Sequence, residues 1–180
     1  MSRRRSIIAV LRNVRDDRRG LAAIEFAIVA PVAVLMILGS ATYFASGRED
    51  SRGKRATYTA ADMIARQTGV TDPFLANVKA LAEHVATADA RAIGFRVTSV
   101  TRVDKDFVVD WSYATTPYAK LTTIGSLGAS PPDIASGQSV IVVETSTPYT
   151  PLFGMFGTAV KRHNNISFAR PRTVSRISKT

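Results

Sequence analysis

Hydrophobic residues form one long run near the N-terminus of the chain and recur at regular intervals after it. The run from Leu21 to Ala45 reads LAAIEFAIVAPVAVLMILGSATYFA and holds a single charged residue, Glu25. As an α-helix its 25 residues would extend ~37 Å, against ~30 Å for the hydrocarbon core of a bilayer. The pattern predicts a tilted transmembrane helix. A signal peptide cleaved near Ala45-Ser46-Gly47 is the alternative, but signal peptides have apolar regions of only about 7–15 residues.

The helical pattern continues into polar sequence beyond the apolar run. It predicts one helix from about Leu21 to Arg66, half in the bilayer and half as a stalk. Gly47 and Gly53 weaken this helix by ~1 kcal/mol each relative to alanine. Gly69 is expected to end it.

A second helix is predicted directly after this stalk. Asp72 is its expected N-cap, with Pro73 at the first helical position. His84 is expected to be a surface or packing residue rather than a metal ligand. Hydrophobic residues at helical spacing predict one buried stripe, made of Phe74, Val78, Leu81 and Val85.

The rest of the chain is patterned as strands. Bulky and polar residues alternate over Phe107–Tyr113, which predicts that side chains 107, 109, 111 and 113 share one face. Phe95–Val103 is the expected partner strand, joined by a hairpin turn at Asp104-Lys105-Asp106.

Two more strands complete the predicted sheet. Val140–Val143 is a continuous apolar run, typical of a central strand that is covered on both faces. Asn165–Arg170 predicts a last strand with Ile166 and Phe168 inward, and residues 114–137 predict a long surface loop. The expected fold class is α+β, with helices packed on an antiparallel sheet.

Composition limits the chemistry that the chain can perform. Its 180 residues include two His and no Cys, which excludes a disulfide framework, thiolate metal sites and a cysteine nucleophile. The sequence has no nucleophile elbow, phosphate-binding loop, metalloprotease motif or dinucleotide fingerprint. We therefore expect no enzymatic activity, no cofactor and no metal site. Trp111 and Tyr113 are assigned to the core, with a ligand platform as the alternative.

The net charge of +10 is concentrated at the two ends of the chain. Residues 1–20 carry +5, residues 161–180 carry +6, and the segment between them carries −1. A nucleic-acid-binding domain builds its basic face into the fold, so this distribution argues against nucleic acid as a partner. The basic tail is expected to be solvated, with acidic lipid head groups or a partner as the alternative. The apolar loop 151–157 is expected to contact either another subunit or its own core.

Basic residues on the two sides of the apolar run predict its orientation. Seven Arg precede the run, and Arg48, Arg52, Lys54 and Arg55 follow it. The bias favours a cytoplasmic N-terminus and a domain on the other side of the membrane, which in a bacterium is the periplasm or the cell surface.

An unusual set of residues marks the entrance to the apolar run. The basic leader ends in Gly20, the run begins at Leu21, Glu25 lies at its fifth position and Phe26 follows. Glycine permits the extended backbone that a protease requires. A carboxylate at mid-membrane is unfavourable by about 2.5–3.5 kcal/mol and is a functional hypothesis by default. The alternative is that Glu25 reaches the interface and favours the positive end of the helix dipole.

These residues resemble the processing motif of type IV prepilins and pseudopilins. Residues 23–31, AIEFAIVAP, resemble the AxEFAxxxP signature of TadE-like pseudopilins from the tight-adherence (Flp) pilus system, and segments 108–112, 142–153 and 170–172 extend the resemblance. It implies that a membrane prepilin peptidase cuts between Gly20 and Leu21. It also implies that Glu25, next to Phe26 in the motif, meets the amino-terminal ammonium of a neighbouring subunit during assembly. Independently of the resemblance, Pro31 predicts a kink in the helix.

The expected organisation is a basic cytoplasmic leader (1–20), a transmembrane helix (21–45) and a periplasmic α+β domain with a basic tail (46–180). The resemblance implies a pilin-like fold and a minor pilin or pseudopilin that helps to build the pilus. Its expected partners are the inner membrane, the prepilin peptidase, other pilin subunits and the assembly machinery, with the cell surface as a possible destination after processing. The first alternative is a single-pass anchored periplasmic domain that binds a ligand or an envelope partner. The second is a secreted enzyme behind a long signal peptide.

Overall fold

The longest element is the α-helix α2, which runs from Leu21 to Ala65 and agrees with the predicted helix to within one residue. The computed structural model describes residues 20–87, 92–149 and 161–180. The chain divides into two units, Met1–Tyr43 and Phe44–Thr180, and α2 contributes residues to both. Most of the predicted leader and the apolar loop 151–157 lie outside the described residues.

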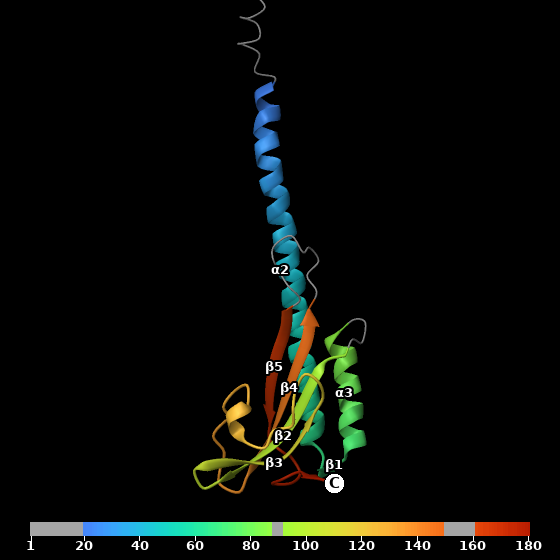
Figure 1. Ribbon diagram of the computed structural model, residues 1–180, viewed down its shortest axis with the longest axis vertical. Coiled ribbons are helices and arrows are strands. Elements are labelled where there is room, and N and C mark those ends of the chain that lie inside the picture. The colour runs from blue at the N-terminus through green and yellow to red at the C-terminus, as the bar shows by residue number, and fades with distance from the viewer. Residues whose placement is uncertain (1–19, 88–91, 150–160) are drawn as a thin grey trace, which may run out of the picture. The chain divides into compact units, whose positions relative to one another are not determined.

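The second unit is an α+β domain, as predicted (Figure 1). Its main sheet is antiparallel with the strand order β3-β2-β4-β5, and a second sheet pairs β1 with β6 in parallel. The elements after α2 are β1 (Gly69–Val70), α3 (Asp72–Ala86), β2 (Gly94–Val103), β3 (Asp106–Ala114), the 3-10 turn η2 (Ile124–Ser126), β4 (Ser139–Tyr149), β5 (Lys161–Ala169) and β6 (Ser178–Lys179).

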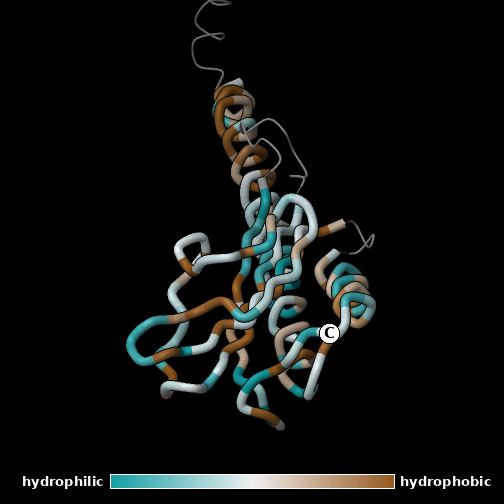
Figure 2. Tube along the Cα trace, turned by 60° about the horizontal axis from the view of Figure 1, so that its bottom comes forward, coloured by the Kyte–Doolittle hydropathy of each residue, from teal (hydrophilic) through white to brown (hydrophobic). Residues whose placement is uncertain are grey.

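Hydrophobic clusters cover both faces of this sheet. The larger cluster joins α2 and α3 to one face through Ile64, Leu75 and Phe95. On the opposite face, Ile134 of the long loop packs with Val140 and Val142 of β4. Brown hydrophobic positions recur along the strands in Figure 2. The prediction that 140–143 form a central strand covered on both faces is confirmed, because all four side chains are fully buried.

Helix α3 is rotated relative to the predicted stripe. Its buried residues are Leu75, Val78, Ala82 and Ala86, whereas Leu81 and Val85 are 41% and 36% exposed. The small side chains of residues 82 and 86 belong to the same hydrophobic cluster as three alanines of α2. The predicted stripe was therefore wrong at residues 81 and 85.

The cap of α3 also differs from the prediction. The side chain of Thr71 accepts a hydrogen bond from the backbone N–H of Phe74 at 3.3 Å, which makes Thr71 the N-cap and Asp72 the first helical residue. The Asp72 carboxylate is instead paired with Lys179, at 2.9 Å.

Strand β3 contains a bulge that changes which face its side chains occupy. The hairpin with β2 turns at Asp104-Lys105 as predicted, but the register shifts so that Asp110 is an extra residue between the pairs Val100–Val109 and Ser99–Trp111. Phe107 therefore packs on the loop-covered face, while Trp111 packs on the helix-covered face. The prediction of one shared face for residues 107, 109, 111 and 113 was wrong, because one extra residue reverses the alternation.

Candidate functional site

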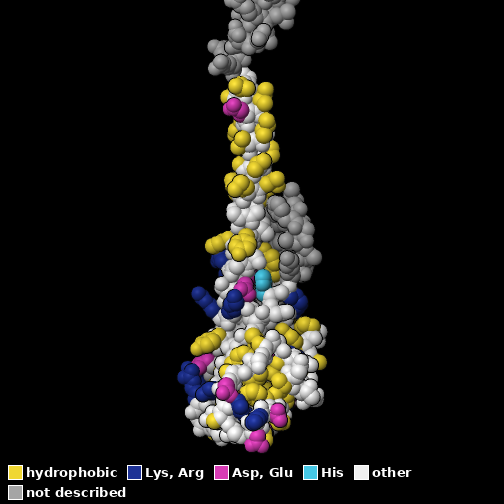
Figure 3. Space-filling view, turned by 90° about the vertical axis from the view of Figure 1, so that its left-hand side faces the viewer, with side chains coloured by type: hydrophobic (Ala, Val, Ile, Leu, Met, Phe, Trp, Pro, Cys, Tyr) yellow, Lys and Arg dark blue, Asp and Glu magenta, His cyan; other side chains and the backbone are white. Residues whose placement is uncertain are grey.

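The apolar part of α2 leaves its large hydrophobic side chains exposed, and Figure 3 shows them in yellow along the face in view. Within the described residues, α2 is the one helix that is long and apolar enough to cross a membrane, and none of its most apolar stretch is buried. The exposed large hydrophobic residues here are Leu21, Ile24, Phe26, Ile28, Val29, Val32, Val34, Leu35, Met36 and Ile37. A water-exposed surface of this extent is unfavourable, and a bilayer would cover it.

The predicted processing residues lie together at the start of this helix. Leu21 is the first residue of α2, Gly20 directly precedes it, and Glu25 is exposed one turn later. No described atom lies within 4 Å of where a side chain at Gly20 would begin, so packing among the described residues gives no reason for glycine here. Pro31 lies inside α2, which continues through it, and a kink stays a prediction.

A polar seam joins the second half of α2 to β4 and β5. The hydroxyl oxygens of Thr57 and Thr145 lie 2.6 Å apart, and the Thr57 hydroxyl is also 2.7 Å from the Gly53 carbonyl oxygen. Further along, His163 lies 3.5 Å from the Ser46 hydroxyl and 3.9 Å from the Asp50 carboxylate. The helix is thus fixed to the sheet by directional contacts as well as by the hydrophobic cluster.

Gly53 allows the closest approach in this seam. A β-carbon at Gly53 would lie 2.6 Å from the side-chain nitrogen of Asn165 and 3.3 Å from the Thr147 hydroxyl. Those two polar atoms are buried and have no hydrogen-bond partner among the described residues. Any side chain at position 53 would therefore have to displace the Asn165 side chain, so the glycine that weakens the helix by propensity permits this close contact with the sheet.

A buried ion pair lies on the opposite face of the sheet. Arg96 of β2 and Glu144 of β4 are paired in register, with Nε and Oε2 2.5 Å apart. The Arg96 guanidinium also donates to the carbonyl oxygens of Ala119 and Ser126, at 3.3 and 3.1 Å. The Gly128 backbone N–H donates to the second oxygen of Glu144 at 3.1 Å. The pair therefore holds the long loop against the sheet.

Tyr118 completes this cluster beside a hollow of about 310 Å³. Its ring lies 4.8 Å from the Arg96 guanidinium carbon. Burial raises the pKa of the Tyr118 phenol, and the nearby Glu144 carboxylate acts in the same direction. Because the charged groups of Arg96 and Glu144 are engaged within the protein, the hollow offers no free charge for a ligand.

The C-terminal tail is largely exposed, as expected, but it is also tied to the domain. Arg172, Arg176 and Lys179 form ion pairs with Asp62, Asp110 and Asp72, respectively. Ile177 is fully buried, and its carbonyl oxygen accepts a 2.8 Å hydrogen bond from the Trp111 indole. The tail also adds β6, a strand that was not predicted.

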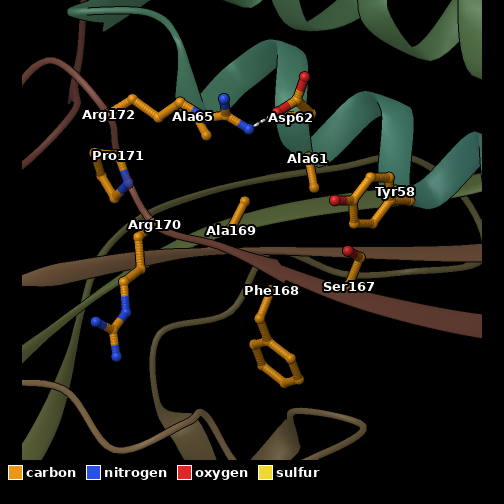
Figure 4. A pocket seen from close by; sticks show the side chains of 10 residues that line it. All are labelled: Tyr58, Ala61, Asp62, Ala65, Ser167, Phe168, Ala169, Arg170, Pro171 and Arg172. Carbon is orange, nitrogen blue, oxygen red and sulfur yellow. Dashed lines mark hydrogen bonds and ion pairs between the residues drawn. The ribbon is translucent and has the colours of Figure 1, made fainter.

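A groove of about 320 Å³ lies between the end of α2 and the start of the tail (Figure 4). Arg172 reaches Asp62 across it, and the Arg172 backbone N–H donates to the Ala65 carbonyl oxygen at 2.9 Å. Phe168 and Arg170 point away from α2 in this view. The polar groups of this groove thus serve to hold the tail in place.

No set of three or more His, Asp or Glu side chains in the described ranges could hold a metal ion. His84 is exposed on α3, and Trp111 packs against the main cluster. In comparisons with known protein families, curated proteins and solved structures, nothing matched the chain.

Proposed function

We propose that this chain is a membrane-anchored assembly protein, a TadE-like minor pilin or pseudopilin of a tight-adherence pilus. The supporting observation is that the motif Gly20-Leu21 coincides with the beginning of α2, whose apolar side chains are unburied and whose second half packs on an α+β domain. In this proposal the protein is not an enzyme but the substrate of one, the prepilin peptidase.

The proposed topology follows the charge bias of the sequence. The Arg-rich leader lies in the cytoplasm, α2 crosses the inner membrane once, and the domain, with a pilin-like role, lies in the periplasm. Cleavage after Gly20 leaves a free amino group on Leu21. The partners are then the peptidase, neighbouring pilin subunits and the assembly machinery.

Glu25 has the central part in assembly under this proposal. It is the only charged side chain between Leu21 and Ala45 and is exposed on α2. A carboxylate in apolar surroundings gains most from an opposite charge, because the medium screens little. The ammonium of Leu21 on a neighbouring copy supplies that charge.

The test combines the mature N-terminus with a charge-removing variant. N-terminal sequencing should give Leu21; Met1 or Ser2 would instead indicate an uncleaved anchor, and a start near Arg48 a secreted protein. The Glu25→Gln variant should insert into the membrane and be cleaved, yet form at least tenfold fewer surface pili. A tenfold loss corresponds to a weakening of each subunit contact by about 1.4 kcal/mol. If Glu25 only interacts with the positive end of the helix dipole, the substitution should lower helix stability by about 0.3–1 kcal/mol and leave assembly intact. Normal pili in this strain would refute the assembly role.

A further inference from the structure

Three arginines form one face of α2 just after the apolar run. Arg48, Arg52 and Arg55 have the i, i+4, i+7 spacing that places side chains on the same side of a helix. Arg48 and Arg55 are exposed and Arg52 is half-buried. The three line a surface hollow of about 520 Å³ together with Phe44, Gly47 and Ser51, and no acidic side chain lines it. We call this surface the arginine face.

The charges of the arginine face are not neutralised within the described residues. Arg52 and Arg55 have no ion-pair or hydrogen-bond partner there, and Arg48 contacts only the Phe44 ring, 5.9 Å from its centroid. Lys54, in the same stretch of α2, is by contrast paired with Asp50 at 2.6 Å. The cations of the C-terminal tail are likewise engaged with Asp62, Asp72 and Asp110. The arginine face therefore differs from Lys54 and from the paired cations of the tail.

The position of the arginine face along α2 identifies its partner. Arg48 comes three residues after Ala45, the end of the apolar run, and Arg52 seven residues after it; at 1.5 Å per residue these are about 4.5 and 10 Å along the helix. Each head-group layer of a bilayer is about 5–8 Å thick. Tyr43, which is 83% exposed, belongs to the residue class, Trp and Tyr, that is enriched at this interface. Arginine binds phosphate through paired N–H donors.

We propose that the arginine face binds the phosphate groups of anionic lipids in the membrane that α2 crosses, and so holds the base of the domain against that membrane surface. The proposal rests on the membrane anchoring proposed above. It does not depend on which side of the membrane carries the domain, because the arginine face adjoins the apolar run in either orientation.

The test uses the full chain in nanodiscs, with one fluorophore next to the arginine face. The chain has no cysteine, so Thr59→Cys provides a unique attachment point at an exposed position, one helical turn beyond Arg55 and outside the residues that line the hollow. A fixed amount of head-group nitroxide lipid quenches a fluorophore that lies near the surface. Quenching should rise about twofold or more when neutral phosphatidylcholine is replaced by a mixture with about one-third phosphatidylglycerol. The rise should vanish in ~1 M salt, where the screening length is only about 3 Å.

Arg48→Gln/Arg52→Gln in the labelled chain removes two of the three charges. Each arginine near an anionic surface favours the bound state by about fivefold, so two account for roughly 25-fold, and quenching should fall to its value in neutral nanodiscs. The matched control is Lys105→Gln/Lys120→Gln, which removes the same charge at exposed positions of the domain. This control should quench like the parent.

Three results would overturn the inference. Equal quenching in neutral and anionic nanodiscs would show that lipid charge does not influence the distance of the domain from the membrane. The arginine face would then be available to bind a protein partner instead. An equal loss in the control variant would assign the effect to net charge rather than to this face. A chain that an alkaline wash removes from the nanodiscs would refute the membrane anchor and the lipid contact together, whereas the first two results leave the anchor intact.

Discussion

At the scale of single residues, Arg96 and Glu144 determine how the long loop lies on the sheet. Both side chains are more than nine-tenths buried, and together they bind the backbone of residues 119, 126 and 128. Taking such a pair out of water is unfavourable by several kcal/mol per ion, so the contact contributes more to placing the loop than to net stability.

Removing one charge of this pair should therefore be far worse than removing both. Glu144→Gln leaves a buried, uncompensated Arg96 and should lower the free energy of unfolding by about 3–5 kcal/mol. The double variant Arg96→Met/Glu144→Leu should recover most of that loss, because no buried charge is left. Denaturant unfolding of the full chain in detergent micelles, followed by near-UV circular dichroism, measures both. A loss below about 1 kcal/mol in the single variant would mean that water reaches the pair.

At the scale of elements, the contact of α2 with β5 depends on a residue that isolated helices disfavour. Gly53 lies against Asn165 and Thr147, whereas Gly47, six residues earlier, has no described atom within 4 Å of where its side chain would begin. A side chain would therefore meet a neighbouring strand at position 53 but open space at position 47. The two glycines of the same helix can be compared directly.

Leucine at the two positions should have opposite effects on stability. Gly47→Leu should stabilise the domain by about 0.5–1 kcal/mol through helix propensity. Gly53→Leu gains the same propensity but must displace the Asn165 side chain, so we expect a net loss of about 1–3 kcal/mol. Thermal unfolding followed by circular dichroism compares the variants directly. Equal stabilisation by both would contradict the close contact between α2 and β5.

The elements themselves were largely predictable, because their hydrophobic periodicity is a local property. The helix from Leu21, the hairpin at Asp104-Lys105 and the central strand at 140–143 all agree with the pattern. The bulge at Asp110 could not be predicted from the sequence. One extra residue reverses which face the following side chains occupy, but it leaves the alternation of bulky and polar residues in the sequence unchanged. The predicted face of α3 was wrong because hydrophobic periodicity gives most weight to bulky side chains, whereas the buried face of this helix includes the small residues Ala82 and Ala86.

The part of the candidate site that could be predicted is the part whose residues are close together in the sequence. Gly20, Leu21, Glu25 and Phe26 are neighbours in the sequence, so their combination can be recognised without a structure. The ion pairs of the tail join residues that are far apart in the chain, so no local sequence pattern predicts them. Arg48, Arg52 and Arg55 were counted as charges for orientation, and only the structure distinguishes them from the paired Lys54.

At the scale of the whole molecule, the last residues of the chain lie against elements from its first half. Strand β6 pairs with β1, which comes directly after α2, and the Thr180 backbone N–H donates to the Val70 carbonyl oxygen at 3.0 Å. Ile177, fully buried, belongs to the cluster shared by α2, α3 and the sheet. The tail is therefore more than a basic appendage, because it contributes Ile177 to the core and β6 to the second sheet.

Deleting residues 177–180 should destabilise the domain and expose Trp111, the only tryptophan of the chain. Loss of a fully buried isoleucine corresponds to about 2–5 kcal/mol, and the indole also loses its acceptor, the Ile177 carbonyl. We expect a red shift of the tryptophan emission and a lower unfolding midpoint. The substitution Thr180→Ala, which keeps the backbone contact, is the control. Unchanged emission in the truncated chain would show that the tail does not cover Trp111.

The late position of β6 also sets the order in which the domain can be completed. A chain is synthesised and, in the proposed topology, exported from its N-terminal side, so the partners of Asp62, Asp72 and Asp110 arrive last. Contacts between distant parts of a chain form slowly because a long loop must close first. A molecule halted during export would keep its main hydrophobic cluster open to proteases, and only complete translocation would give it protection from degradation.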